Sequence, residues 1–510
     1  MDGPTIRRIS AGLVCASLVI SLGACSSSTA GSSAAAGDKN TLVLGMNSDI
    51  QGWDPSIQPG FQGWAGEAIW DKLVFCNAQG EPVEGLAKTW EISEDRKSFT
   101  AHLRSGVKFS DGSEFTSEDV KSSFKYYATH SSSTGDYEGM TIDTPDDLTV
   151  RINWPDSQPV IESKICNVAI SSTELLDSGQ VNDTPIGTGP YVLDSGKTTR
   201  GSVYTFTKNK DYWNSDLYPY ENLEIKVIED STAAISALQA GQIDGTLINM
   251  SDIKQVEGFG AKVEQFEGIT TRLLLTDHLG EKIPALGDVR VRQAINMVFD
   301  KEAMVKSLFG GYGEPTAQVF RKGTAAYIEN LKDPYPFNVE KAQKLMKEAG
   351  YEDGFEIELP TMTGQGLEEL IPYVVQQLAK INITVKQVPL SGANAISDLL
   401  SGTYPVVFWR LGNLGNAKQQ VQVEMDSSGY WNLEHQKDDY VDSRWKELAT
   451  ADDATAKKLL QEINQYVIDQ AWFAPMAYTG NFYAHSKSVS IPTQSDVEAL
   501  APKLRDFQKN

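Results

Sequence analysis

Residues 86–127 read LAKTWEISEDRKSFTAHLRSGVKFSDGSEFTSEDVKSSFKYY, and this stretch carries more information about the fold than any other. Apolar and polar residues alternate over 99–103, which predicts a half-buried strand because successive strand side chains point to opposite faces. Asp111-Gly112 predicts a turn. Thr116 and Asp119 have the spacing of a capping box, so a helix is expected to begin directly after Thr116.

The order of short motifs in this stretch resembles one protein family. TWEIS and ED, then HLR, GVKF and DG, then FT and EDV before an aromatic helix, are similar to the signature region of the extracellular solute-binding proteins of peptide/nickel-type ABC importers, the oligopeptide/dipeptide-binding lipoprotein family. Four further motifs extend the resemblance over nearly the whole chain. They are GTGPY within 185–191, NKDYWN at 209–214, GDVRVRQAIN at 287–296 and NVEKAQKLMKEAG at 338–350.

Size and composition limit the alternatives. A chain of 510 residues is too long for one hydrophobic core and is expected to form two or three domains. Its 40% hydrophobic and 9% aromatic residues are typical of a globular protein. The formal net charge of −23 argues against a nucleic-acid partner, which requires a basic surface.

The N-terminus has the features of a bacterial export signal. Arg7 and Arg8 precede an apolar run over 9–20, which is too short to span a bilayer but suits a secretory signal. The run ends at Leu-Gly-Ala-Cys over 22–25, which resembles a lipobox. We therefore expect residues 1–24 to be a lipoprotein signal peptide, with an ordinary signal peptide and a chance cysteine as the alternative.

The lipobox resemblance implies that Cys25 carries a diacylglycerol and fatty acids such as palmitate, which anchor the protein to the outside of the cell membrane. Residues 25–40 are rich in Ser, Ala and Gly and are expected to be a flexible tether. Beyond the tether the chain contains two cysteines, Cys76 and Cys166. An exported pair can form a disulfide, but the sequence leaves unpaired burial open.

Two β-α-β patterns indicate an α/β fold. The first is a strand over 223–228, then a helix that begins after Asp230 and ends at Gly241. Residues 239–244 resemble the family's short helix-strand junction and lead into the second strand. The second consists of a strand over 355–359, a helix around 367–380 and a strand over 383–388.

The family resemblance implies a type II periplasmic-binding-protein-like fold, with two α/β lobes that are hinged by two crossing strands and an extra subdomain on lobe I. Proteins of this kind close over a ligand like a clamp. The implied boundaries are 41–75, 186–279 and 481–510 for lobe I, 76–185 for the extra subdomain and 280–480 for lobe II.

Motifs for catalysis or for metal binding are absent from the sequence. No two of its five histidines have metal-ligand spacing, and it has no HExxH, CxxC or GxSxG motif. We therefore expect no catalytic residue, no metal site and no cofactor. An extracellular hydrolase remains an alternative, because a glycosidase can place its two carboxylates far apart in sequence.

The resemblance also points to candidate ligand contacts. In the family the loop after the first strand lies at the cleft, which singles out Trp53 and Trp64. Tyr430 and Trp431 lie where the family often brings an aromatic residue and an asparagine to the pocket. Trp409 matches the tryptophan of a strand that is followed in peptide-binding relatives by W-G-x-D, whose aspartate holds the peptide amine.

This sequence departs from that pattern, because Asn413 or a neighbour replaces the acid and Arg410 adds a positive charge. A buried ammonium without a counter-charge costs several kcal/mol, so a free peptide N-terminus is put in doubt. Asn413, Asn416 and Trp409 could instead hold a neutral polyhydroxylated or amide ligand. Alternatively, a peptide is held mainly by its backbone while Arg410 binds a carboxylate through a bidentate fork. A structural ion pair is the third interpretation of Arg410.

The function implied is a lipid-anchored, monomeric, extracytoplasmic receptor that captures a solute between its lobes and delivers it to an ABC permease and ATPase. A peptide is the expected ligand class. The alternatives are an oligosaccharide or other non-peptide solute, an extracellular hydrolase, and a surface adhesin or signalling receptor that reuses the fold.

Overall fold

The computed structural model describes residues 40–50, 52–57, 63–77, 80–131, 134–362, 367, 370–391, 395–412, 416–492 and 501–510. The predicted signal peptide, the lipidation site Cys25, nearly all of the tether and Asn413 lie outside these ranges. None of the helices within them has both the length and the apolar character needed to cross a membrane.

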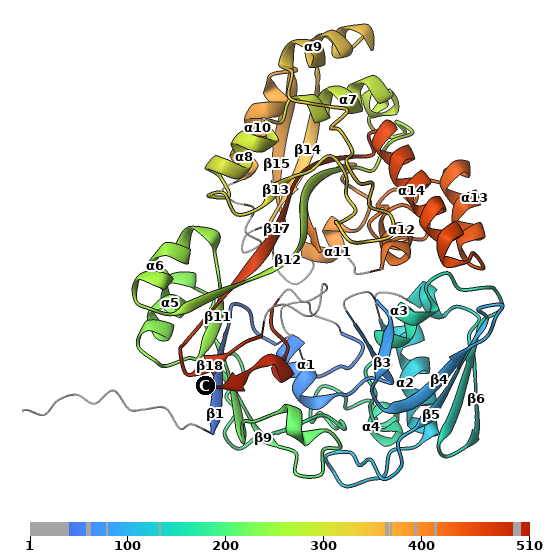
Figure 1. The fold of residues 1–510 in the computed structure, drawn as a ribbon, viewed down its shortest axis with the longest axis vertical. Coiled ribbons are helices and arrows are strands. Elements are labelled where there is room, and N and C mark those ends of the chain that lie inside the picture. Colours follow the sequence, from blue (N-terminus) through green and yellow to red (C-terminus); the bar gives the residue numbers. More distant parts are fainter. Residues whose placement is uncertain are drawn as a thin grey trace, which may run out of the picture. The chain divides into compact units, whose positions relative to one another are not determined.

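A mixed nine-stranded sheet connects the main parts of the fold (Figure 1). Its strands follow the order β16-β12-β17-β11-β1-β10-β9-β8, and β13 also pairs with β17. The central strands β1, β10 and β11 are parallel to one another. The strands of one half are β1 (Thr41–Met46), β8 (Tyr191–Leu193), β9 (Val203–Lys208), β10 (Asn222–Val227) and β11 (Gly245–Ile248).

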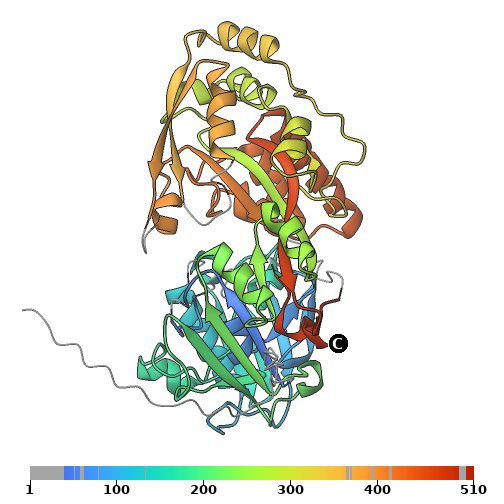
Figure 2. The same cartoon turned by 90° about the vertical axis from the view of Figure 1, so that its left-hand side faces the viewer.

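Two long strands, β12 (Lys262–Leu275) and β17 (Phe473–His485), pair antiparallel along nearly their whole length. At one end β17 pairs with β11, and at the other β12 pairs with β16 (Val406–Gly412). The register shifts at Gly268, whose φ of 134° disfavours any residue with a Cβ. These are the two crossing strands that the family resemblance implies (Figure 2).

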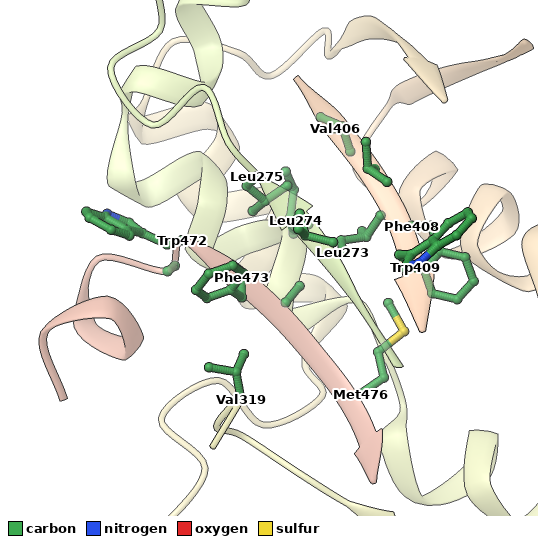
Figure 3. Close-up of a cluster of buried hydrophobic side chains, with 14 of the residues drawn as sticks. Leu273, Leu274, Leu275, Val319, Val406, Phe408, Trp409, Trp472, Phe473 and Met476 are labelled. Carbon is green, nitrogen blue, oxygen red and sulfur yellow. The ribbon is translucent and has the colours of Figure 1, made fainter. Parts of the chain in front are cut away.

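The largest hydrophobic core, here called the C-terminal core, gathers buried side chains from Leu273 to Ala477. Figure 3 shows its centre, where Leu273, Leu274 and Phe473 lie near Phe408. The elements around this core are η5 (Pro284–Gly287), α7 (Val289–Met297), α8 (Lys301–Ser307), β13 (Glu314–Pro315), α9 (Val339–Glu348), β14 (Phe355–Thr361), α10 (Ile371–Ala379), β15 (Ile383–Pro389), α11 (Ala395–Leu399), α12 (Ala417–Glu424), α13 (Asp439–Leu448) and α14 (Asp453–Asp469).

A second core, the N-terminal core, forms around β1, β9 and β10. Leu44, Phe206 and Ile225 are fully buried there, and α1 (Gly63–Ile69) packs against it. The elements that complete this half are η3 (Ser215–Leu217), α5 (Ser231–Gln239), η4 (Met250–Asp252), α6 (Ile253–Gly258), β18 (Val489–Ser490), η6 (Leu504–Asp506) and β19 (Gln508–Lys509).

A third core contains the stretch over 86–127. The predicted strand is β5 (Ser98–Leu103), and the predicted helix is α2 (Ser117–His130), with Thr116 as N-cap and the capping box to Asp119 formed. Both predictions are confirmed. The strand order in this sheet is β4-β5-β7-β6. The other elements of this part are β2 (Val74–Cys76), β3 (Pro82–Glu84), β4 (Ala87–Ile92), η2 (Thr134–Tyr137), β6 (Thr141–Asp146), β7 (Thr149–Asn153), α3 (Ile161–Cys166) and α4 (Thr173–Ser178).

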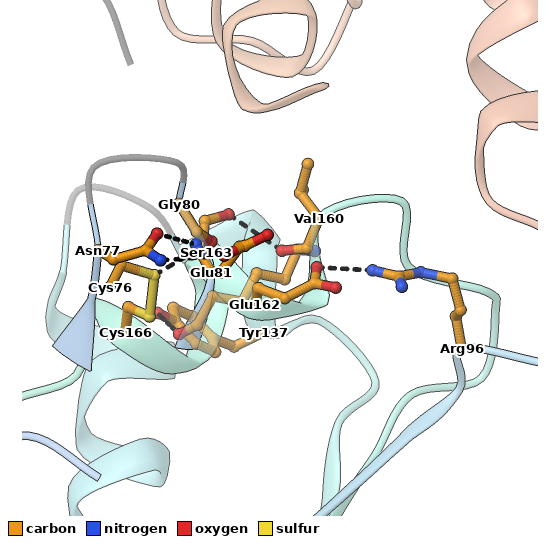
Figure 4. Close-up of a disulfide and its surroundings, with 11 residues drawn as sticks. Cys76, Asn77, Gly80, Glu81, Arg96, Tyr137, Val160, Glu162, Ser163 and Cys166 are labelled. Carbon is orange, nitrogen blue, oxygen red and sulfur yellow. Dashed lines mark hydrogen bonds and ion pairs between the residues drawn. A yellow bond between two sulfur atoms is a disulfide. The ribbon is translucent and has the colours of Figure 1, made fainter. Parts of the chain in front are cut away.

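A disulfide fastens this third core at one edge. It joins Cys76 at the end of β2 to Cys166 at the end of α3, with the two Cα atoms 5.7 Å apart (Figure 4). The sequence left this pairing open, and the structure shows it bonded. The bond ties the β2–β3 hairpin to a segment 90 residues further along the chain.

Candidate functional site

A cavity of about 630 Å³ lies where the N-terminal half of the sheet meets the crossing strands. Asn47, Ile228 and Asn249 line it, and each directly follows the last residue of a parallel strand, β1, β10 or β11. Ligands of open parallel sheets bind outside the carboxyl ends of the strands. The position of the cavity therefore marks it as a candidate ligand site.

The opposite wall comes from the C-terminal core and from the crossing strands. Residues 307–310, at the end of α8 and in the loop after it, contribute to the lining, as do Leu370 before α10 and Arg410 on β16. Residues 480–482 of β17 complete it. A solute in this cavity would thus contact groups attached to both cores.

Arg410 has an unusual environment for a partly buried cation. Its Nη2 donates a hydrogen bond to the Gly480 carbonyl oxygen at 3.1 Å. Its Nε is buried and has no hydrogen-bond partner among the described residues. Burial alone lowers the pKa of Arg410 to about 10, from an ordinary value of 12.5, so the guanidinium is charged at neutral pH.

The rest of the lining combines apolar surface with small polar groups. Phe309 and Phe482 are buried and present apolar surface, whereas Ser231 and Ser307 offer hydroxyl groups. Glu229 is the other charged side chain among the described lining residues. Apolar walls with a few placed polar groups are typical of sites for organic solutes.

Two of the predicted contacts lie elsewhere. Trp53 and Trp64 are buried in the N-terminal core, at 2% and 5% exposure. The Trp64 indole Nε1 donates to the Pro502 carbonyl oxygen at 2.6 Å. Trp53 contacts Tyr204 edge to face, with ring centroids 5.8 Å apart, and lines a separate cavity of about 310 Å³. Neither residue lines the cavity of Arg410, and their role as ligand contacts stays a prediction.

The predicted contacts near Arg410 form a second group. Trp409 packs into the C-terminal core (Figure 3). Its ring centroid lies 5.9 Å from that of Trp431. Neighbouring residues of a strand point to opposite faces, so Trp409 and Arg410 face different sides of β16. Tyr430 is 45% exposed and contacts Trp431. Asn416 caps α12, where its side chain accepts a hydrogen bond from the Lys418 amide. Among the predicted contacts that the structure describes, Arg410 lines the cavity.

Sequence reasoning missed most of the lining. Residues 246–251 follow the short helix-strand junction that ends at Asp244, and residues 307–310 end a helix that the motif at 287–296 precedes. The first group had a usable signal, since it lies at the carboxyl end of a strand in a predicted β-α-β unit. The second group had none, because nothing local to 307–310 indicates what faces it.

The fold has two α/β cores that are joined by two crossing strands, and a solute-sized cavity lies beside those strands. This arrangement is that of a two-lobed binding protein. The model of the family described as "Bacterial extracellular solute-binding proteins, family 5 Middle" matches residues 81–433. The chain belongs to this family of bacterial extracellular solute-binding proteins, as the sequence motifs predicted.

Similar proteins of known name span nearly the same length. The chain is 27% identical to heme-binding protein A of Haemophilus influenzae, over 96% of this chain and 97% of that protein. It is 26% identical to a dipeptide-binding protein of Pseudomonas aeruginosa, over 82% of this chain and 86% of that protein. These names describe the relatives, whose ligands differ from one another.

Solved structures confirm the fold. The periplasmic binding protein DppA of Helicobacter pylori, in complex with the peptide STSA, superposes with a TM-score of 0.80 at 22% identity, covering 92% of this chain and 98% of that one. AgaA of A. tumefaciens R10, in complex with agropinic acid, superposes with a TM-score of 0.81 at 24% identity, covering 92% and 99%. The predicted type II periplasmic-binding-protein fold is therefore confirmed.

Proposed function

We propose that this chain is the solute-binding component of an ABC importer and that it captures a peptide in the cavity of Arg410. The observation that carries the proposal is the lining of that cavity, which comes from segments attached to both cores. A ligand favours the closed form only through contacts that the open form lacks, so it must contact both sides. The dipeptide-binding relative supports peptide as the ligand class.

The proposed lobes follow the boundaries expected from the sequence. Lobe I comprises 41–75, 186–279 and 481–510, lobe II comprises 280–480, and 76–185 form the extra subdomain. The separate hydrophobic cores support this division, since the C-terminal core draws its buried side chains from 273–477. The protein acts as a monomer, and its partners are a permease and an ATPase that other chains supply.

The lipid anchor is part of the same proposal. Cys25 is acylated, and the tether lets the lobes work at the outer surface of the membrane. Support comes from the Leu-Gly-Ala-Cys motif over 22–25 and from the family, whose members are extracellular. Expression with an alkyne-tagged palmitate should label the wild type but not Cys25→Ala, which should be released from the membrane fraction. Equal labelling of both would contradict the anchor.

A binding panel tests the ligand class. The protein is purified from its host without denaturation and analysed by native mass spectrometry, then titrated calorimetrically with di- to hexapeptides and with oligosaccharides. We expect co-purified or added peptides to bind with one-to-one stoichiometry and to be recovered unchanged in mass. Binding of oligosaccharides in place of peptides would contradict the ligand class, and a change in ligand mass would indicate a hydrolase.

A further inference from the structure

Arg410 is a partly buried cation without a counter-ion in the described part of the chain. The bond to Gly480 uses one of the five N–H groups of its guanidinium. No acidic group contributes to its pKa, which burial alone lowers, and no described carboxylate lies within ion-pair distance of it. A charge that is partly removed from water without a partner is poorly solvated, so a ligand group of opposite charge would be favoured beside it.

Two arginines that are fully buried, Arg272 and Arg292, are compensated by other groups of the chain. Arg272 on β12 has its Nη2 2.6 Å from Glu424 Oε1, and both side chains are almost fully buried. Arg292 on α7 donates to the carbonyl oxygens of Leu286, His278 and Gln470. Arg410 differs from both, and it also differs in lining a cavity of about 630 Å³. The missing partner is therefore expected to enter from the cavity.

We propose that Arg410 binds a carboxylate group of the solute and that the cavity selects ligands that carry one. The proposal rests on the proposed function, in that a solute must enter this cavity. A guanidinium matches a carboxylate with two parallel hydrogen bonds, and the bond to Gly480 holds it in place before the ligand arrives.

The second charge in the lining supports the same ligand class. Glu229 follows β10 on the wall of the N-terminal half and is exposed. It would repel a second anion and attract an ammonium group. A cavity with one guanidinium on one wall and one carboxylate on the other suits a zwitterion, and a short peptide with free ends is a zwitterion.

The test uses matched peptide libraries. Di- to hexapeptides are prepared once as free acids and once as C-terminal amides, with a third set of amides that contain one glutamate. Binding to the wild type, Arg410→Gln and Arg151→Gln is measured by native mass spectrometry and calorimetry. Arg151 is the control, since it is an exposed arginine on β7 whose Nε donates to Thr100.

We expect the wild type and Arg151→Gln to prefer free acids over neutral amides. In Arg410→Gln the affinity for free acids should fall about 10- to 100-fold, as the loss of a charge-assisted hydrogen bond predicts. If the glutamate-containing amides bind like the free acids, a side-chain carboxylate can replace the C-terminal one. If they bind like the neutral amides, the C-terminal carboxylate is required. Equal binding of acids and neutral amides to the wild type would overturn the proposal.

Failure of every peptide to bind would count against peptide as the ligand class but would leave Arg410 open to a direct test. Sodium glutarate and neutral glutaramide are then compared by thermal shift. A rise in Tm with glutarate alone, lost in Arg410→Gln, would support the proposal, and the same response in both proteins would overturn it. The unliganded Arg410→Gln should melt no lower than the wild type, because the substitution removes a partly buried charge that no described carboxylate compensates. A lower Tm would point to a structural role instead.

Discussion

Asp71 is a buried acid that holds three donors from distant parts of the chain. Its carboxylate accepts hydrogen bonds from the Tyr212 hydroxyl and the Trp213 indole, each at 2.9 Å, and from the Thr188 hydroxyl at 3.1 Å. Burial nevertheless raises its pKa from 3.8 to about 6, since desolvation outweighs these bonds. The folded protein therefore binds this proton more tightly than the unfolded chain.

This shift predicts a pH dependence of stability. Between about pH 4 and pH 6 the folded state holds the Asp71 proton that the unfolded state has lost. The free energy of unfolding therefore falls as pH rises through this range. The fall that Asp71 contributes is on the order of 3 kcal/mol. Above pH 6 its contribution is constant. Urea denaturation of Asp71→Asn from pH 4 to 7 should show a smaller slope than the wild type. Asp211→Asn, at an exposed site nearby, should keep the wild-type slope. An unchanged slope in Asp71→Asn would contradict this.

Single residues show where sequence reasoning stops. Arg410 could be singled out from its place in a motif, but the choice among its three interpretations could not be made. That choice depends on which carboxylates face it, and strand pairing brings those neighbours from positions far away in sequence. Trp53 and Trp64 illustrate the same limit, because a tryptophan that lines a cleft and one that fills a core have the same local pattern.

At the scale of elements, helices with local signals were predicted well. α5 begins after Asp230, whose side chain accepts from the Ala233 amide, and the chain turns at Gly241 with φ of 70°. α9 begins after Asn338 in the same way. The β14-α10-β15 unit is confirmed as a parallel pair with its helix. The family resemblance implied two crossing strands but not which segments form them. The structure shows that they are β12 and β17, whose register joins segments about 200 residues apart.

The ion pair between β12 and α12 predicts a large effect on stability. Glu424→Gln should leave Arg272 buried and uncompensated, which costs about 3–5 kcal/mol in the free energy of unfolding. Burial raises the pKa of Glu424 despite the nearby arginine. Water therefore cannot solvate the charge of Arg272 once the carboxylate is removed. Chemical denaturation should show that Arg272→Met with Glu424→Leu is less destabilised than Glu424→Gln. A double variant that is the less stable of the two would contradict this.

The disulfide between β2 and α3 gives a second prediction at this scale. Cys76→Ser with Cys166→Ser frees a loop of 90 residues and should lower the free energy of unfolding by on the order of 4 kcal/mol. Dithiothreitol should reproduce the loss in the wild type but have no effect on the double variant. In the double variant, backbone hydrogen exchange should increase most at β2 and β3 relative to the wild type. The same Tm for the wild type and the variant would contradict a stabilising role.

For the whole molecule, the family resemblance predicted the architecture but not the site. Two α/β cores, two crossing strands and a third core around 86–127 all follow from motifs that the sequence displays. The cavity assembles residues 228, 229 and 231 with residues 246–251, 307–310 and 480–482. No local pattern links these segments, because the ends of strands from different parts of the chain meet only in the folded sheet.

Hydrogen exchange with and without a bound ligand tests the central claim, that the protein binds a solute between its two cores. The ligand is a peptide identified by the binding panel, and exchange is followed by mass spectrometry at saturation. We expect simultaneous protection of 246–251 on one wall and 307–310 on the other, with amides of β6 unchanged as an internal control. Protection of only one wall, or of neither, would contradict it.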